Sequence, residues 1–418
     1  MTNENQKTST PNKDQFTEFK KDPRLESAIY KQGAFKTKKK QHQDLISQWA
    51  KLDIEEFADA IRQYKYKTKQ ELITQLENKP FENRQKILES LSDTAELLTM
   101  ASLERAEQLQ IEKFGEPLYL SSYKQMQRSH LALVAMGKLA TREINYFSDL
   151  DVIFIFSHRG ETAGTKEPGN QIKNTQFFIR VAQRFISMMT LLTSRGRCYQ
   201  IDTELRPSGN QGTLVTSFDY FLDHQMNKAA YWERMALTRS RAISQDCEFE
   251  EALTKQIDEL VYHRPLPQDF AVVMNDIRQK VLRERAKTKD DYFDLKLGQG
   301  GIMDIEFTLQ LIQLKFGRLY PQLRRKSVFE ILKALKEHSL LSNTELKNLT
   351  QAYVLFRSIE SKLHLEKRRS FHVISLKESD NTNLAEQLQL SEKQLISDIK
   401  DARSTVQSLY RKFYESIS

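Results

Sequence analysis

Two short apolar runs near the middle of the chain constrain its fold more than any other feature. LALVAMG occupies residues 131–137 and DVIFIFS occupies residues 151–157, and turn-forming residues bound both runs. Two more segments, YQIDTEL at 199–205 and GTLVTS at 212–217, alternate in polarity or are rich in β-branched residues. Such patterns are typical of strands. The segment between the second and third strands has helical spacing, so the sequence predicts a small sheet with one or more helices packed against it.

The segments on either side of these strands are predicted to be helical. Apolar residues recur at three- and four-residue steps from Leu45 to Tyr64, and helical spacing returns after about residue 250. We therefore predict an α+β fold that is predominantly helical. Its predicted parts are a flexible basic tail (1–40), an N-terminal helical segment (41–120), a mixed catalytic domain (121–248) and a C-terminal helical bundle (249–418).

The composition excludes several classes of protein. The 418 residues are 39% hydrophobic and 29% charged, and no apolar run approaches the ~20 residues that a membrane span needs. The N-terminal sequence MTNENQKTSTPNKDQ has no apolar signal core, and there are two cysteines, Cys198 and Cys247. We therefore expect a soluble, cytoplasmic protein. The formal net charge of +8 fits either a solvated basic surface or an anionic partner. The patterns of an RNA-binding sheet are absent, which makes nucleic acid an unlikely partner.

Two aspartates stand at the start of the second predicted strand. Asp149 and Asp151 are two residues apart, so their side chains point to the same face of that strand. Carboxylates forced together repel each other, and a divalent cation relieves the repulsion. Mg²⁺ prefers such hard oxygen ligands together with substrate phosphates, as in phosphoryl or nucleotidyl transfer. The alternative interpretation is a solvated strand end with two incidental aspartates. Asp202, in the next predicted strand, supplies a third carboxylate.

Residues before the aspartates extend the pattern. Gly137 ends the first predicted strand and Ser148 precedes Asp149, so backbone N–H groups and a hydroxyl are available to hold a phosphate. Lys138 either adds positive charge toward a triphosphate or faces solvent. The order strand, glycine, short helix, Ser-Asp-x-Asp, strand resembles the nucleotidyltransferase layout of the polymerase β superfamily.

Four longer motifs carry a more specific resemblance. They are MGKLATREINYFSDLDVIF, YQIDTELRPSGNQGTLVTS, YWERMALTRSRAI and DLKLGQGGIMDIEFTLQ, and they span about residues 130–310. In this order they resemble the signature motifs of the bacterial glutamine synthetase adenylyltransferases. The resemblance implies a polymerase β-like catalytic domain, ATP as substrate, magnesium (two ions) as cofactor and a tyrosine of glutamine synthetase as acceptor. It also implies a nitrogen-signalling regulatory protein as a possible further partner.

Enzymes of this family contain two such units, one that attaches AMP from ATP and one that removes AMP by phosphorolysis. RPSG, LVTS, ALTRSR and DIEF are more similar to the adenylylating unit, whereas LKLGQGG is similar to the other. We therefore predict a magnesium-dependent transfer of AMP to protein tyrosine. Phosphorolytic deadenylylation, which releases ADP, is the alternative. A non-catalytic regulator that binds a nucleotide or a partner is an alternative of another class.

By this resemblance, Asp149 and Asp151 hold the metals, and Asp202 completes the site and helps to deprotonate the acceptor hydroxyl. Gly137, Lys138 and Ser148 hold the triphosphate. These six residues form the predicted catalytic and nucleotide-binding core.

Four outlying residues allow two interpretations each. Arg206 is predicted to share a strand face with Asp202 and to meet phosphate, with a structural ion pair as the alternative. Lys296 and Glu306 are expected to approach the site from the C-terminal bundle, although a turn and a helix dipole explain that segment equally well. Glu204 replaces a family arginine and is predicted to reverse the charge on the strand face of Asp202, which would weaken triphosphate binding, alter the target or extend the acidic cluster. Trp232, Glu233 and Arg239 are interpreted as core and ion-pair residues of a supporting helix.

Overall fold

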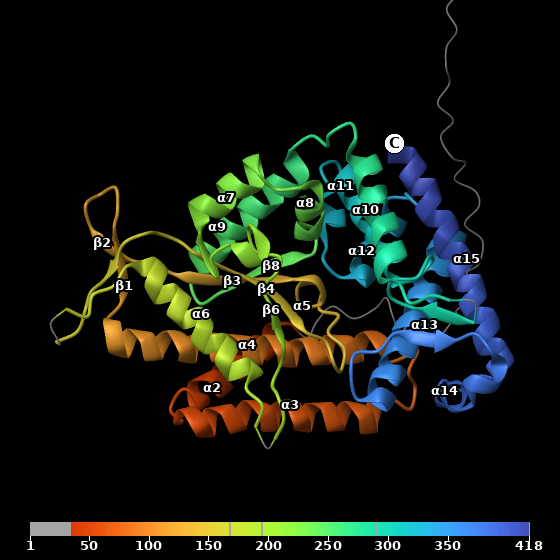
Figure 1. Ribbon diagram of the computed structural model, residues 1–418, viewed down its shortest axis with the longest axis horizontal. Helices are drawn as coiled ribbons and strands as arrows, with labels where there is room; N and C mark the ends of the chain where they lie inside the picture. The colour runs from red at the N-terminus through yellow and green to blue at the C-terminus, as the bar shows by residue number, and fades with distance from the viewer. Residues whose placement is uncertain (1–34, 167–168, 194, 290, 418) are drawn as a thin grey trace, which may run out of the picture.

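The computed structural model describes residues 35–166, 169–193, 195–289 and 291–417 (Figure 1). Three helices open the described chain: α2 (Phe35–Trp49), α3 (Ile54–Leu76) and α4 (Arg84–Phe114). Asp53 caps α3, because the Glu56 backbone N–H donates to its carboxylate at 2.8 Å. The predicted N-terminal helical segment is therefore present. Helix α2 begins within the predicted basic tail, and residues 1–34 of that tail lie outside the described residues.

The central sheet contains the predicted strands. Its strand order is β6–β4–β3–β8, and β7 pairs with the same edge of β4 as β6 does. Strands β3 and β4 are antiparallel, whereas β6 and β7 run parallel to β4. The strands are β3 (Leu131–Met136), β4 (Leu150–Phe156), β6 (Ile201–Asp202), β7 (Val215–Ser217) and β8 (Ser240–Ser244).

Three details differ from the sequence-based expectation. The third strand is only two residues long, because the chain turns immediately after Asp202. Strand β8 lies within a motif that we interpreted as a supporting helix; the helix α8 (Tyr231–Leu237) ends before it. Trp232 is 39% exposed and is therefore not a core residue.

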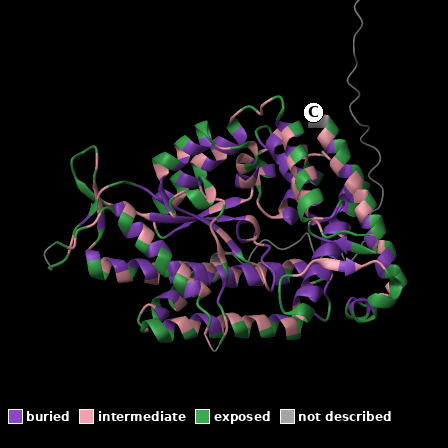
Figure 2. Cartoon of the chain, viewed as in Figure 1, coloured by how far each residue is buried: buried purple, intermediate pink, exposed green. Residues whose placement is uncertain are grey.

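Both faces of the sheet are buried, which explains why LALVAM is a continuous apolar run rather than an alternating one (Figure 2). Leu133, Val152 and Phe154 pack with α3, α4 and α6 (Asn174–Thr190) in one core. On the other face, Val134 and Ile153 pack against helices on the C-terminal side of the sheet. These helices are α7 (Phe218–Asn227), α8, α9 (Cys247–Asp258), α10 (Phe270–Arg285) and α11 (Ile302–Phe316).

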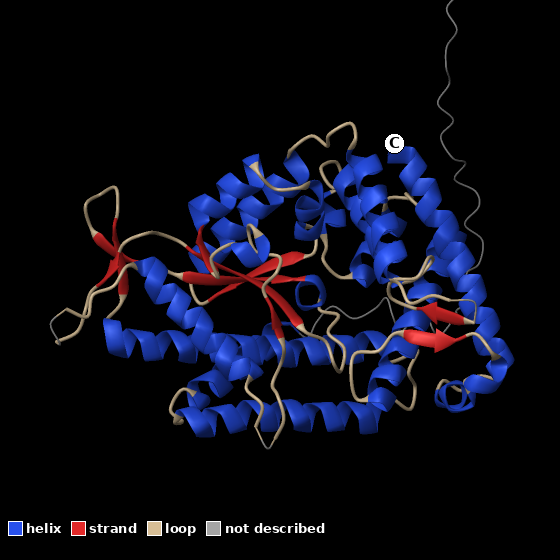
Figure 3. Ribbon diagram, in the orientation of Figure 1, coloured by secondary structure: helices blue, strands red, loops and turns tan. Residues whose placement is uncertain are grey.

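The C-terminal region is helical, as expected, apart from one small ribbon (Figure 3). Its own core joins α11, α12 (Val328–Glu337), α13 (Asn343–Lys367), α14 (Thr382–Gln387) and α15 (Glu392–Ile417). Strands β9 (Tyr292–Asp294) and β10 (Val373–Ser375) form the antiparallel ribbon. A separate three-stranded sheet contains β1 (Pro117–Leu120), β2 (Met126–Arg128) and β5 (Glu161–Thr162).

The predicted fold class is confirmed: small mixed sheets are surrounded by helices that make up most of the chain. Among the helices of the described ranges, none is both long enough and apolar enough to cross a membrane.

Candidate active site

The aspartates meet at one edge of the central sheet. Asp151 and Asp202 are register partners across the parallel pair β4–β6, which places their side chains next to each other. Asp149 lies one residue before β4, and alternation along the chain puts it on the same face as Asp151. Asp202 also accepts a hydrogen bond of 2.8 Å from the backbone N–H of Glu204. The structure thus pairs Asp151 with Asp202, and Asp149 lies one residue before the same strand.

Burial and Asp202 together disfavour the ionised forms of Asp149 and Asp151. Burial and the neighbouring Asp202 raise the pKa of Asp151 to about 6. The same two causes, burial first, raise the pKa of Asp149. The positive charges of Lys296 and Lys138 act in the opposite direction on both aspartates. An edge that concentrates negative charge in this way is suited to a cation.

Gly137 lies directly against this edge. It follows the last residue of β3 and begins the short helix α5 (Gly137–Thr141). Its φ angle is +51°, and a Cβ at this position would lie 2.9 Å from Oδ2 of Asp151. Glycine is therefore required here for two reasons, the left-handed backbone and the close approach of a carboxylate.

Replacing Gly137 with alanine should weaken Mg²⁺–ATP binding by about tenfold or more, because the new methyl group displaces the Asp151 carboxylate (about 1.4 kcal/mol for each factor of ten). Titration calorimetry measures the loss. Gly196→Ala is the matched control, because Gly196 has a φ of +86° but no atom within 4 Å of an added Cβ. Equal effects of the two substitutions would show that backbone strain alone matters.

Ser148 closes the turn before Asp149. The Asn145 backbone N–H donates to Oγ of Ser148 at 2.9 Å, and the Ser148 N–H donates back to the Asn145 carbonyl at 3.1 Å. Asn145 is buried and reaches α13, where its amide donates to Glu360 and its side-chain oxygen accepts from Ser361. The turn that holds Ser148 is therefore fixed from the C-terminal region, and phosphate binding by Ser148 stays a prediction.

Lys138 forms an ion pair instead of facing solvent. Its Nζ lies 3.2 Å from Oε1 of Glu360, whose side chain is only 1% exposed. Burial lowers the pKa of Lys138, and Glu360 opposes this effect. The solvent-facing alternative for Lys138 was wrong.

Glu306 belongs to the same buried network of charges. It forms ion pairs with Arg239 and, at 2.8 Å, with Arg357, which in turn contacts Glu360 at 2.9 Å. Burial acts to raise the pKa of Glu306, but the two arginines outweigh burial and hold it below its usual value. Glu306 thus ties α11 to α13 and to the segment before β8. The ion-pair role expected for Arg239 is confirmed.

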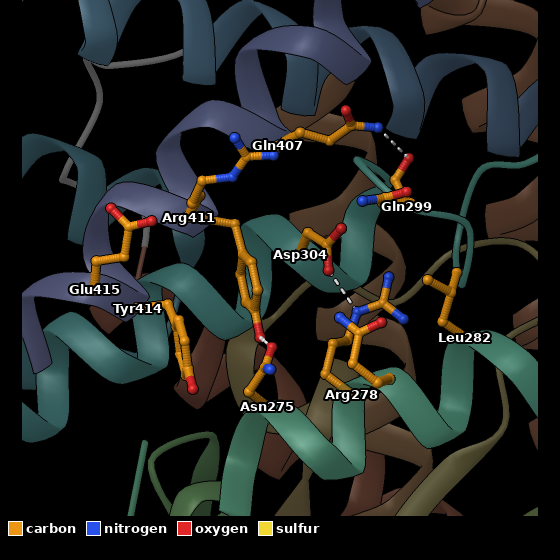
Figure 4. Close-up of a pocket in the computed structure, with 11 residues that line it drawn as sticks. Asn275, Arg278, Leu282, Gln299, Asp304, Gln407, Arg411, Tyr414 and Glu415 are labelled. Carbon is orange, nitrogen blue, oxygen red and sulfur yellow. Dashed lines mark hydrogen bonds and ion pairs between the residues drawn. The ribbon is translucent and has the colours of Figure 1, made fainter. Parts of the chain in front are cut away.

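Lys296 lies between β9 and α11, on a loop that a buried ion pair holds in place. Figure 4 shows this pair, Arg278 and Asp304. Arg278 of α10 pairs with Asp304 of α11 and donates to the carbonyls of Leu297 and Gly298 at 3.1 and 3.2 Å. A cavity of about 310 Å³ lies behind this loop, between α10 and α15. The positive charge of Lys296 lowers the pKa of Asp149 and Asp151, and the approach of Lys296 to the nucleotide stays a prediction.

Arg206 and Glu204 do not share a strand face with Asp202, because β6 ends at Asp202. That premise was wrong. The Arg206 guanidinium donates to the Thr203 carbonyl at 2.7 Å and so stabilises the turn that follows β6. Glu204 is exposed and accepts from the Asn210 amide at 3.2 Å. Nucleotide binding by Arg206 stays a prediction, but strand alternation no longer places Arg206 beside Asp202.

Within the described ranges, no group of three histidine, cysteine, aspartate or glutamate side chains is arranged to hold a metal ion. The predicted three-carboxylate metal site is therefore not present as a preformed cage. Its closest approach is the pair formed by Asp151 and Asp202, with Asp149 beside it.

Two family models match the chain. The model for glutamate-ammonia ligase adenylyltransferase matches residues 19–256, which is more than half of the chain. The chain belongs to this family. Residues 275–414 match a second model, described as GlnD PII-uridylyltransferase. The boundary between the two matches falls near the start of α10. The buried ion pair between Lys138 and Glu360 joins the two matched regions.

Curated relatives of the adenylyltransferase family agree with the first match. A bifunctional glutamine synthetase adenylyltransferase/adenylyl-removing enzyme from Shewanella woodyi is 36% identical over 56% of this chain and 24% of its own length. The enzyme of the same name from Acinetobacter baylyi is 36% identical over 67% of this chain and 31% of its length. The chain thus spans 24% to 31% of the length of these relatives.

Several residues of the family motifs play a part that sequence reasoning missed. Glu143 is 1% exposed and accepts from the Val328 backbone N–H at 3.0 Å, which anchors the start of α12. Asn145 and Lys138 contact α13. A buried polar residue between two strands is the signal that could have identified them, but its partner lies more than 180 residues away along the chain.

His364, one turn beyond Glu360 on α13, gives a testable pH dependence. Burial lowers the pKa of His364 to about 4, and neither ring nitrogen has a hydrogen-bond partner among the described residues. Because its folded pKa lies below the unfolded value of about 6.5, protonation favours the unfolded chain. Stability is thus complete above pH 6.5 and is lost as pH falls toward 4.

We therefore expect His364→Phe to reduce the acid destabilisation between pH 6.5 and pH 4 by about 2–3 kcal/mol. Chemical denaturation at a series of pH values measures this. His263→Phe, at a side chain 39% exposed, should leave the pH dependence unchanged. A parallel pH profile for His364→Phe and the unmodified protein would contradict the explanation.

Proposed function

We propose that this chain is a magnesium-dependent nucleotidyltransferase that moves AMP from ATP to a tyrosine of glutamine synthetase. The observation that carries the proposal is the register pairing of Asp151 with Asp202 at the edge where Gly137 lies. Family membership and the names of the relatives support the reaction and the acceptor. The reducing environment implied by two separate free cysteines supports a cytoplasmic location.

The residues at the edge fit magnesium bound together with a nucleotide. Mg²⁺ usually takes one or two carboxylates and completes its shell with water and substrate phosphates, so a preformed three-residue cage is not needed. The raised pKa of Asp151 reflects a charge that a cation would compensate. Asp149, Asp151 and Asp202 would hold the metal, which would neutralise phosphate charge and activate the α-phosphorus.

The protein side chains have separate roles in the proposed transfer. Gly137 and the Ser148 turn bind the triphosphate, and Lys138 and Lys296 supply positive charge beside the aspartates. The tyrosine oxygen forms a bond to the α-phosphorus while the bond to pyrophosphate breaks. Asp202 helps to take the phenolic proton, because it is closest in register to Asp151. Catalysis then consists mainly of positioning and electrostatic stabilisation.

The reverse direction is the second candidate. The names of the relatives include an adenylyl-removing activity, and the same edge would serve phosphate attack on an AMP-modified tyrosine, with ADP as product. The match of residues 275–414 to a PII-uridylyltransferase model supports a regulatory protein, such as the PII of that description, as a further partner.

Mass spectrometry after incubation with ATP, Mg²⁺ and purified glutamine synthetase tests the proposal. A tyrosine with one added AMP, together with release of pyrophosphate, is the expected result. A parallel incubation of AMP-modified glutamine synthetase with phosphate detects the reverse reaction as ADP. If neither product forms and calorimetry finds no Mg²⁺–ATP binding, the chain is a regulator without catalytic activity and the proposal is wrong.

A further inference from the structure

Helix α13 contacts the segment between β3 and β4 through two adjacent buried residues, Glu360 and Ser361. Oε1 of Glu360 lies 3.2 Å from Nζ of Lys138, and Oε2 accepts from the Asn145 amide at 3.2 Å. The Ser361 hydroxyl donates to Oδ1 of Asn145 at 2.9 Å. One turn of a C-terminal helix thus binds two residues of the segment between β3 and β4.

Both of these residues connect directly to the proposed nucleotide site. Lys138 follows Gly137, where an added Cβ would lie 2.9 Å from Oδ2 of Asp151. Asn145 holds the hydroxyl and backbone of Ser148, which precedes Asp149. Lys138 and the Ser148 turn are the two ends of the predicted phosphate-binding segment. A displacement of this turn of α13 would therefore move both ends at the same time.

We propose that α13 positions the nucleotide site and that Glu360 is the positioning residue for Lys138. The inference rests on the proposed function, because it assigns a role within ATP binding. A lysine ammonium has three donors, so the single ion pair with Glu360 leaves two for phosphate oxygens. Glu360 itself is held by Arg357 at 2.9 Å, which fixes the carboxylate and with it the direction of the lysine.

The negative charge of Glu360 also keeps Lys138 protonated. The pKa of Lys138 is lowered by burial, by Arg357 on α13 and by Lys296 on the loop before α11. Glu360 is the strongest opposing influence, and Glu306 on α11 adds to it. The negative charges of Asp149 and Asp151 attract Lys138 and also favour its protonated form. Removing the charge of Glu360 therefore makes loss of the lysine proton easier as pH rises.

The test compares Glu360→Gln with Glu366→Gln. Glu366 lies on the same helix but its ion pair, with Lys367, is at the surface. Calorimetry measures the dissociation constant of Mg²⁺–ATP from pH 6.5 to 9. We expect the control to match the unmodified protein. Glu360→Gln should bind about tenfold more weakly at pH 7, with a larger loss at higher pH.

A double-mutant cycle with Lys138→Gln separates positioning from a general loss of structure. Because Glu360 acts through Lys138, Glu360→Gln should have little further effect on ATP affinity once the lysine is absent. Circular dichroism confirms that each variant is folded at the temperature of titration. Equal effects of Glu360→Gln in both backgrounds, or unchanged affinity and pH profile, would overturn the inference. Failure of the unmodified protein to bind Mg²⁺–ATP would instead refute the proposed function.

Discussion

AMP transfer should fall by at least about 10³-fold when Asp151 is replaced by asparagine, because a metal clamp contributes several kcal/mol to the transition state and each 1.4 kcal/mol is a factor of ten. Asp151 is the central member of the edge: it pairs in register with Asp202 and lies against Gly137. Asparagine keeps the size of the side chain but cannot neutralise a cation. A radiolabelled AMP-transfer assay at saturating ATP measures the loss.

The same substitution should not destabilise the fold. Burial and Asp202 raise the pKa of Asp151 to about 6. At pH 7.5 without divalent cations the carboxylate is therefore ionised, although burial and the charge of Asp202 disfavour its ionised form. Asparagine removes that repulsion, and the melting temperature should stay the same or rise. Asp276→Asn, at an exposed position on α10, should leave both transfer and melting unchanged. Transfer at the unmodified rate by a folded Asp151→Asn protein would refute the catalytic assignment.

The strands and helices that show a regular local spacing of apolar residues could be predicted from the sequence. Strands β3 and β4 match the apolar runs closely, because both faces of the sheet are buried and every position except Asp151 has an apolar side chain. The expectation that Asp202 lies near Asp151 came from the family resemblance, and the structure pairs the two residues in register across β4 and β6. The N- and C-terminal helices followed from three- and four-residue spacing.

Long-range partners could not be predicted in the same way. Lys138 suggested phosphate binding or solvent, yet its carboxylate partner is Glu360, 222 residues further along the chain. Alternation suggested that Arg206 faces Asp202, but the chain leaves the sheet at Asp202 and the arginine bonds to its own turn. For Lys138 the missing information was which distant element supplies the opposite charge, and for Arg206 it was where the strand ends.

Replacing Glu306 with alanine is expected to lower the free energy of unfolding by about 3–5 kcal/mol, because it leaves two buried arginines without their shared carboxylate. Arg239 and Arg357 both pair with Glu306, and Arg357 is only 1% exposed. Arg357 keeps Glu360 at 2.9 Å and Arg239 keeps Glu143 at 3.5 Å. The penalty is therefore that of buried positive charge left only partly compensated, which is larger than the net contribution of an intact ion pair. Guanidinium denaturation followed by circular dichroism measures the change.

A surface ion pair provides the matched control. Glu82 pairs with Lys79 at 3.2 Å, with side chains 45% and 61% exposed, and Glu82→Ala should cost less than about 1 kcal/mol. If Glu306→Ala lost no more stability than Glu82→Ala, the buried network would not hold α11, α13 and the segment before β8 together. The apolar core that joins the sheet to α11 would then carry that contact without help from the Glu306 ion pairs. The two stability measurements therefore decide whether the Glu306 ion pairs contribute to holding the C-terminal helices against the segment before β8.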